Sequence, residues 1–182
     1  MYQKALISLN KAQKLNPNIS EIYFTKSNIY LKISQLKNAK TALEKGLRIE
    51  PNNHNAIFQL GNILLIEKNY SEAIEVFDKS LKIKPDFWQA INNKCLAYFE
   101  KDYINLSIKL FEKAISIEEN AEPLLGLAAC LRITDIELSL EVHSTITGNL
   151  INKPIENFMN LDQYYRYSKD EELIAKIKEK LL

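Results

Sequence analysis

Residues 54–87 read HNAIFQLGNILLIEKNYSEAIEVFDKSLKIKPDF, and this stretch decides the fold. Its first half places a bulky, a small and a bulky residue at spacings of four and three: Ile57, Gly61 and Leu64. Its second half uses the same spacings for a small, a large and a small residue: Ala73, Phe77 and Ser80. Residues spaced in this way share one face of a helix. Residues 69–71 between the two halves indicate a short turn, so the stretch predicts a pair of amphipathic helices.

The pattern recurs along the chain with a fixed period of about 34 residues. Pro17, Pro51 and Pro85 are evenly spaced by this period, and each follows a helical pattern. In the second helix of each pair, four columns of similar residues fall in register: Ala5, Ala39, Ala73 and Ser107; Leu9, Leu43, Phe77 and Phe111; Ala12, Gly46, Ser80 and Ala114; Leu15, Ile49, Ile83 and Ile117. In the first helix the columns are Tyr23, Ile57 and Ile91; Ser27, Gly61, Cys95 and Ala129; Tyr30, Leu64 and Tyr98. Small residues let a neighbouring helix approach and large ones fill the space beyond, so we expect Gly61 and Ala73 to face each other.

The order of these residues resembles the tetratricopeptide repeat. The best match consists of Ile57, Leu60, Gly61, Leu64, Ala73, Phe77, Ser80 and Pro85. The resemblance covers about residues 1–119 and weakens beyond them, where Arg132 stands in a column of bulky residues. It implies an all-α fold, a right-handed superhelical solenoid of antiparallel helix pairs.

We expect residues 1–182 to form one such solenoid domain. The expected parts are a half repeat at 1–19, repeats at 20–53, 54–87 and 88–120, a degenerate repeat at 121–153, and C-terminal capping helices at 154–182. Pro154 suits a helix start, and Ser168 followed by Glu171 suits a capping box. The chain opens on the second helix of a repeat. Three explanations stay open: that helix caps the solenoid by itself, the chain is a fragment, or a partner covers it.

Composition narrows the classes of function. The formal net charge is +1, and Lys alternates with Glu along the chain. The sequence thus lacks the concentrated basic face of a nucleic-acid-binding protein, and we do not expect nucleic acid as a partner. The sequence contains no run of about 18 apolar residues, so we expect no membrane span. Lys and Asn interrupt the N-terminal segment, whereas the core of a signal peptide is continuously apolar. Cys95 and Cys130 lie in apolar helical stretches, as reduced buried thiols do. We therefore expect a cytoplasmic protein.

Residues suited to catalysis or metal binding are scattered. His54 and His143 lie in different repeats, and no cluster of His, Cys and carboxylates has the spacing of a metal site. The four glycines are isolated, so none forms a phosphate-binding loop. We expect no catalytic residues, no cofactor and no metal ion.

The resemblance implies that the first helix of each repeat lines a concave groove, which binds an extended peptide or a helix of a partner protein. The peptide-binding residues expected there are Phe24, Asn28, Asn55, Phe58, Gln59, Asn62, Gln89, Asn92 and Asn93. A carboxamide offers both a donor and an acceptor to an extended backbone, so we expect a ladder in which Asn28, Asn62 and Asn93 share one channel. The alternative is that Asn is simply abundant on the surface of this chain. Adaptors for heat-shock chaperones, which this fold resembles, bind the acidic C-terminal tail of the chaperone with a clamp of Lys and Arg. The positions of those cations are occupied here by Phe24, Phe58, Gln89 and Asn93. We therefore do not expect an acidic chaperone tail as the ligand.

The sequence therefore favours a protein–protein interaction scaffold or adaptor rather than an enzyme. Two alternatives stay open. The repeats could be the targeting region of a larger enzyme, such as a glycosyltransferase, whose catalytic domain is absent from this chain. They could also form a self-assembling structural solenoid, with homo-oligomers joined through the incomplete N-terminal repeat.

Overall fold

Helix pairs follow one another along the chain, as the period of the sequence predicts. The computed structural model describes residues 1–118, 122–123, 126–127 and 129–130. Within these residues the named elements are all helices, and none is a strand: α1 (Tyr2–Leu15), α2 (Ser20–Lys32), α3 (Leu36–Ile49), α4 (His54–Ile66), α5 (Tyr70–Ile83), α6 (Trp88–Glu100) and α7 (Ile104–Ile117). The all-α fold of helix pairs is therefore confirmed. The chain divides into two compact units, Met1–Ala90 and Ile91–Leu182, which we describe separately.

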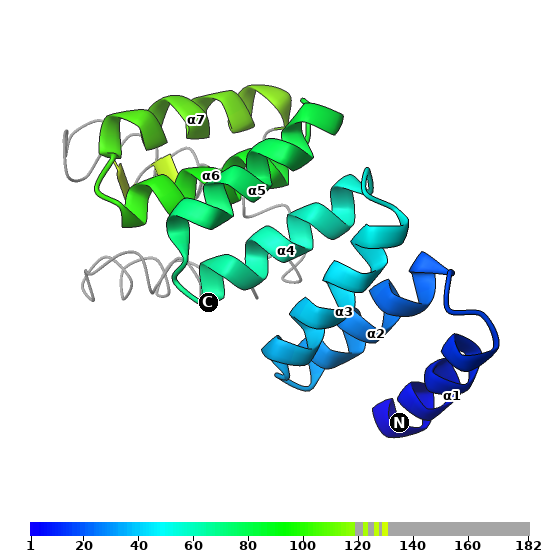
Figure 1. The fold of residues 1–182 in the computed structure, drawn as a ribbon. Helices are drawn as coiled ribbons and strands as arrows, with labels where there is room; N and C mark the ends of the chain where they lie inside the picture. Colours follow the sequence, from blue (N-terminus) through cyan, green and yellow to red (C-terminus); the bar gives the residue numbers. More distant parts are fainter. Residues whose placement is uncertain (119–121, 124–125, 128, 131–182) are drawn as a thin grey trace, which may run out of the picture. The chain divides into compact units, whose positions relative to one another are not determined.

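In the first unit each helix packs against its neighbours in sequence. α2 packs on α3 and α4 packs on α5, and these two pairs meet where α3 contacts α4. α1 packs on α2, and Figure 1 shows α1 (blue) beyond α2 and α3, with the other side of α1 uncovered by a described helix. The first unit thus contains two complete helix pairs and a single helix before them.

Two apolar clusters form the core of the first unit. One joins α3 to α4 through Ala39, Leu43, Ala56 and Ile63. The other joins α4, α5 and the start of α6 through Ile57, Leu64, Ala73, Val76, Phe77, Phe87 and Ala90. Leu47 and Leu60 are half-buried and pack against both clusters. The columns of Ala39 and Leu43 thus lie in the core, as their spacing predicts.

The fourth column of the second helices lies outside the core. Leu15, Ile49 and Ile83 are 88 %, 38 % and 41 % exposed, respectively. Each is the last residue of its helix. In α3 and α5 this aliphatic column is therefore more exposed than the other three.

The turn inside each pair has the same backbone conformation. Ser34, Lys68 and Asp102 have φ angles of 58°, 60° and 62°, and they occupy equivalent positions in successive repeats. In the second pair the N–H of Lys68 donates to the carbonyl of Leu65 (2.9 Å) and the N–H of Asn69 donates to that of Leu64 (2.9 Å). This is the Schellman arrangement, in which a left-handed residue ends a helix. Because only glycine adopts this conformation without strain, the three non-glycine residues are strained there.

A short chain of side-chain bonds fixes the start of α4 and ties it to the preceding pair. The Asn53 side-chain oxygen accepts a hydrogen bond from the Ala56 N–H (2.9 Å), which caps α4. The Asn53 amide also donates to Glu50 Oε1 (3.0 Å). The other oxygen of Glu50 accepts a bond from the Ser20 hydroxyl (2.8 Å). These polar contacts thus link the start of α2 to the start of α4.

The second unit contains most of α6 and all of α7. The Ser107 hydroxyl donates to the carbonyl of Cys95 (3.2 Å), so the two helices lie in contact. The ring of Phe111 lies against Gly126, where any Cβ would collide with it. Apart from a few positions between 122 and 130, the expected degenerate repeat and the capping helices at 154–182 lie outside the described residues, as do Arg132 and His143. In the part of the chain that the structure describes, no helix has the length and apolarity needed to cross a bilayer.

Candidate peptide-binding face

The residues expected to bind a peptide lie on three helices. α2 carries Phe24 and Asn28, α4 carries Asn55, Phe58, Gln59 and Asn62, and α6 carries Gln89, Asn92 and Asn93. Asn92 and Asn93 belong to the second unit, and the others belong to the first. We call Asn28, Asn55, Gln59 and Asn62 the carboxamide face. Three of its members share one side of α4 because they are spaced by four and three residues, and Asn28 occupies on α2 the position that Asn62 occupies on α4.

Both aromatic residues of this set take part in core packing. Phe24 lies against Gly46 of α3, where its ring occupies the space a Cβ would need. The ring of Phe58 lies 4.9 Å from that of Phe87 and 6.0 Å from that of Phe77, measured between centroids. Phe24 and Phe58 are half-buried. Each ring therefore holds helices together and leaves only part of its surface for a ligand.

Gln59 has an unusual polar environment within the carboxamide face. Its side-chain oxygen Oε1 is buried and has no hydrogen-bond partner in the described structure. Asn28 and Asn55 are exposed to solvent, and Asn62 is half-buried. A buried acceptor without a partner costs about 1–3 kcal/mol, and such atoms are uncommon in folded proteins. The face therefore contains an acceptor that would gain a hydrogen bond if its side chain turned outward to a donor.

The carboxamides of the second unit differ from those of the first. Asn92 is 2 % exposed, and its side-chain amide donates to Oδ1 of Asn93 (3.1 Å). Asn93 is half-buried. The two side chains thus bind each other, and Asn92 lies inside the unit rather than on its surface.

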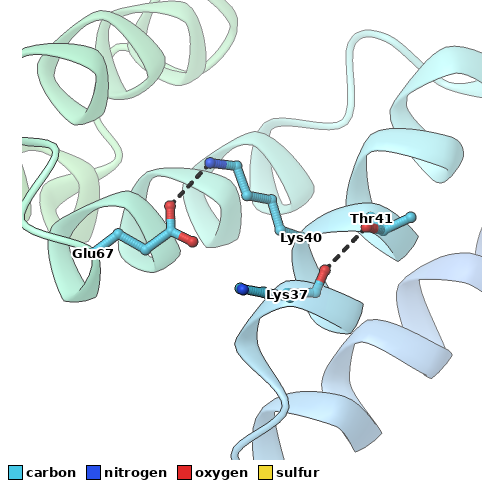
Figure 2. A network of polar contacts seen from close by, with 4 residues as sticks. All are labelled: Lys37, Lys40, Thr41 and Glu67. Carbon is cyan, nitrogen blue, oxygen red and sulfur yellow. Dashed lines mark hydrogen bonds and ion pairs between the residues drawn. The ribbon is translucent and has the colours of Figure 1, made fainter.

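Two lysines link helices of the first unit. Lys40 of α3 forms an ion pair with Glu67 (2.9 Å), the residue that follows α4. Figure 2 shows this pair beside the hydrogen bond from the Thr41 hydroxyl to the carbonyl of Lys37 (3.0 Å). The hydrogen bond from Lys40 to Glu67 raises the pKa of Lys40. Both side chains keep about a quarter of their surface in solvent, 25 % and 28 %, so the pair contributes at most about 1 kcal/mol.

The second charged contact joins α1 to α2. The Lys26 ammonium donates to Oδ1 of Asn10 (2.8 Å) and to Oε1 of Gln13 (2.8 Å). Partial burial lowers the pKa of Lys26, and the positive charge of Lys45 lowers it further. This contact was not predicted from the sequence. The signal was available, because Lys26 and Gln13 stand, one repeat earlier, in the columns of Leu60 and Leu47.

Groups with catalytic potential are either isolated or buried. Among the described residues, no group of three or more His, Cys, Asp or Glu side chains could hold a metal ion. The His54 ring packs edge-on against Phe87, with 5.2 Å between centroids. Cys95 and Cys130 are buried thiols. Burial raises the pKa of the Cys95 thiol and raises that of Cys130 to about 12, so both thiols stay protonated and unreactive at neutral pH.

Comparisons with known proteins agree with this geometry. Residues 20–53 and residues 54–87 each match a family model described as tetratricopeptide repeat. No curated protein matches the chain. A solved structure of MamA, residues 41 to the end, from Desulfovibrio magneticus RS-1 aligns with a TM-score of 0.75 at 21 % identity, covering 81 % of this chain and 84 % of that one. A structure from a study of Pseudomonas aeruginosa pilF aligns with a TM-score of 0.73 at 16 % identity, covering 91 % of this chain and 81 % of that one.

The first unit is thus an all-helical repeat structure, built from helix pairs that stack in sequence. Its complete pairs are tetratricopeptide repeats, at residues 20–53 and 54–87. The resemblance seen in the sequence is confirmed for these two repeats. At identities of 21 % and 16 %, the likeness to MamA and to the pilF structure is a likeness of fold.

Proposed function

We propose that this protein is an interaction scaffold that binds an extended segment of a partner protein on the carboxamide face of α2 and α4. Tetratricopeptide repeats at 20–53 and 54–87 support a protein-interaction scaffold in general. The choice of this face, and of an extended segment as the ligand, is our proposal.

The observation that carries the proposal is the buried, unpartnered Oε1 atom of Gln59. If the Gln59 side chain turns outward, Oε1 can accept from a backbone N–H of an extended peptide, and such segments have many N–H groups free to donate. Asn55 lies one helical turn before Gln59, and Asn62 lies one turn after it. Asn side chains there can pair with both the N–H and the C=O groups of the same peptide backbone.

This mode of binding depends weakly on the sequence of the partner, because main-chain groups supply the hydrogen bonds. Partial exposure of the Phe24 and Phe58 rings leaves apolar surface beside the carboxamides. That surface favours a peptide with an apolar side chain at one or two positions. Asn92 and Asn93 belong to the second unit, and their side chains bind each other. They remain predicted peptide-binding residues, but they are not part of the carboxamide face.

The test is to capture partners from the native cell lysate, to map the bound segment as a peptide, and to measure its affinity for two variants. Gln59→Leu removes the unpartnered acceptor at similar volume. We expect weaker peptide binding, by about 0.5–1.5 kcal/mol, with no loss of melting temperature. The matched control is Gln35→Leu, since Gln35 is exposed at the start of α3. Equal affinity of Gln59→Leu and the parent protein would move the binding site to another face.

Two further expectations belong to this proposal. We propose that the protein acts without catalysis of its own, as scaffolds of this repeat class do. We also propose a cytoplasmic location, which fits two thiols that remain reduced. Fractionation of the native cell, with detection of this protein in each fraction, tests the location directly.

A further inference from the structure

The same column of residues is buried in α3, α5 and α7 and is only half-buried in α1. Ala39 and Leu43 of α3 are 0 % exposed, and Gly46 is also buried. Ala73, Phe77 and Ser80 of α5 are 0 % exposed as well. In α1 the corresponding residues are Ala5, Leu9 and Ala12, and all three are only half-buried. The residue types match, so the difference lies in the neighbouring helices.

The missing neighbour is a helix on one side of α1. α3 lies between α2 and α4. Ala39 and Leu43 form a cluster with two residues of α4, and Phe24, Tyr30 and Leu31 of α2 pack against this cluster. α1 packs on α2 through its other side, where Leu6 is buried and Lys26 binds Asn10 and Gln13. Figure 1 shows no described helix on the other side of α1, and Ala5, Leu9 and Ala12 keep part of their surface exposed. We call these three residues the α1 stripe.

We propose that the α1 stripe binds an acidic amphipathic helix of a partner protein, one that carries a bulky, a small and a bulky residue at spacings of four and three. The shape argument comes from the complete pairs. The stripe is small, large, small, and each covering helix in this chain is bulky, small, bulky: Tyr23, Ser27 and Tyr30 in α2, then Ile57, Gly61 and Leu64 in α4. In the second pair the large Phe77 fills the space left by the small Gly61.

Charge defines the rest of the partner. α1 carries Lys4, Lys11 and Lys14 and no acidic residue, and all three lysines are exposed. A helix with Glu or Asp beside its apolar stripe would gain from these charges, and that gain would weaken as salt screens it. This surface is separate from the carboxamide face, so the inference goes beyond the proposed function.

A second copy of the chain fits the stripe less well. If two α1 helices packed symmetrically on each other, Leu9 at the centre of one stripe would meet Leu9 of the other. The small central residue that Leu9 needs opposite it would be absent. The helices of this chain that carry the bulky, small, bulky pattern already cover their own partners in the first unit, as the burial of Tyr23, Ile57 and Leu64 shows. A separate helix is therefore the occupant to which the proposal commits.

The experiment measures binding of a synthetic helical peptide to the whole protein by fluorescence anisotropy. The probe has about 15 residues, or four turns, with a Leu, Ala, Leu stripe flanked by Glu. We expect saturable binding that weakens as salt rises. Leu9→Asp should weaken it roughly tenfold or more, while Ile7→Asp, at an exposed position of the same helix, should leave it unchanged. Ala5→Phe fills the stripe without removing a core contact, and it should block the peptide while circular dichroism stays that of the parent.

Several outcomes would overturn the proposal. One is a peptide that fails to bind, or that binds Leu9→Asp and Ala5→Phe as well as the parent protein. Another is equal binding of a probe whose central Ala is replaced by Leu, because a bulky centre should not fit over Leu9. Sedimentation that shows a dimer sensitive to Leu9→Asp would assign the stripe to a second copy. Binding to vesicles of anionic phospholipid in place of the peptide would assign it to a membrane surface.

Discussion

The ring of Phe77 lies over Gly61, so that a Cβ atom on Gly61 would stand 2.5 Å from Cε1 of Phe77. The three atoms nearest to that position all belong to the Phe77 ring. The residue that Gly61 meets is therefore Phe77, one turn along α5 from Ala73, the partner that the sequence predicted. Glycine is needed here for space, because the two helices of the pair approach too closely for a side chain.

This contact predicts that Gly61→Leu destabilises the protein. Overpacking of a closed core costs about 1–3 kcal/mol, and Phe77 is fully buried with no room to yield. Urea denaturation, followed by circular dichroism, measures the loss. Gly61→Ala combined with Phe77→Leu should lose less than the sum of its single changes, because the smaller side chain makes room for the methyl group. A Gly61→Leu protein that melts with the parent would show that the helix register is wrong.

Two buried serines predict opposite effects of the same substitution. The Ser27 hydroxyl is buried and has no hydrogen-bond partner in the described structure, whereas the Ser80 hydroxyl donates to the carbonyl of His54 (3.0 Å). We expect Ser27→Ala to raise the free energy of unfolding by up to about 1 kcal/mol, and Ser80→Ala to lower it by about 0.5–1.5 kcal/mol. Thermal and urea unfolding of both variants measure these changes in the free energy of unfolding. Equal loss in both would mean that Ser27 does form a hydrogen bond.

The strained turns predict a stabilising glycine. Lys68 has a φ of 60°, a conformation that costs a non-glycine residue about 1–2 kcal/mol. Lys68→Gly removes this strain but makes the unfolded chain more flexible, so we expect a net gain of about 0.5–1 kcal/mol. The matched control is Lys82→Gly in the last turns of α5, which should cost up to about 1 kcal/mol. If both variants lost stability equally, left-handed strain at Lys68 would be absent.

How far the sequence predicts the fold depends on whether a feature repeats. Helix pairs and buried columns such as Ala39 and Leu43 were predictable, because burial imposes the same residue size at the same place in each repeat. The left-handed turns were not, because Ser34, Lys68 and Asp102 share a conformation but no residue type. Conformation there is imposed by the helices on either side rather than by the turn residue.

The candidate site was less predictable than the fold. Resemblance to a known repeat selects helix positions, but it cannot say which side chain lacks a partner, and the unpaired acceptor of Gln59 depends on every neighbour around it. Phe58 shows the same limit: its position predicted a peptide-binding residue, yet its ring also contacts Phe77 and Phe87. The position of a residue in the repeat predicts the side of the helix on which it lies. Whether its side chain is available to a ligand depends on the residues packed around it.

The junction of α1 with α2 predicts a stabilising change and a pH dependence. Lys26 and Gln13 occupy the positions that Leu60 and Leu47 occupy between α4 and α3, where both leucines pack on the core. Gln13→Leu combined with Lys26→Leu should therefore replace a polar contact by apolar packing and raise the melting temperature. Because the two side chains touch, their effects should not be additive. Each single change leaves a polar partner without its hydrogen bond, so the double variant is the decisive one.

The pH dependence follows from the lowered pKa of Lys26. Between that lowered value and the ordinary value of 10.5, the unfolded state binds more protons than the folded state. The contribution of Lys26 to stability therefore rises as the pH increases toward 10.5. The stability advantage of the double variant should accordingly shrink between pH 7 and pH values just below 10.5, as shown by urea midpoints of both proteins across that range. An advantage that stays constant with pH would mean that the Lys26 ammonium is as well solvated in the folded protein as in the unfolded chain.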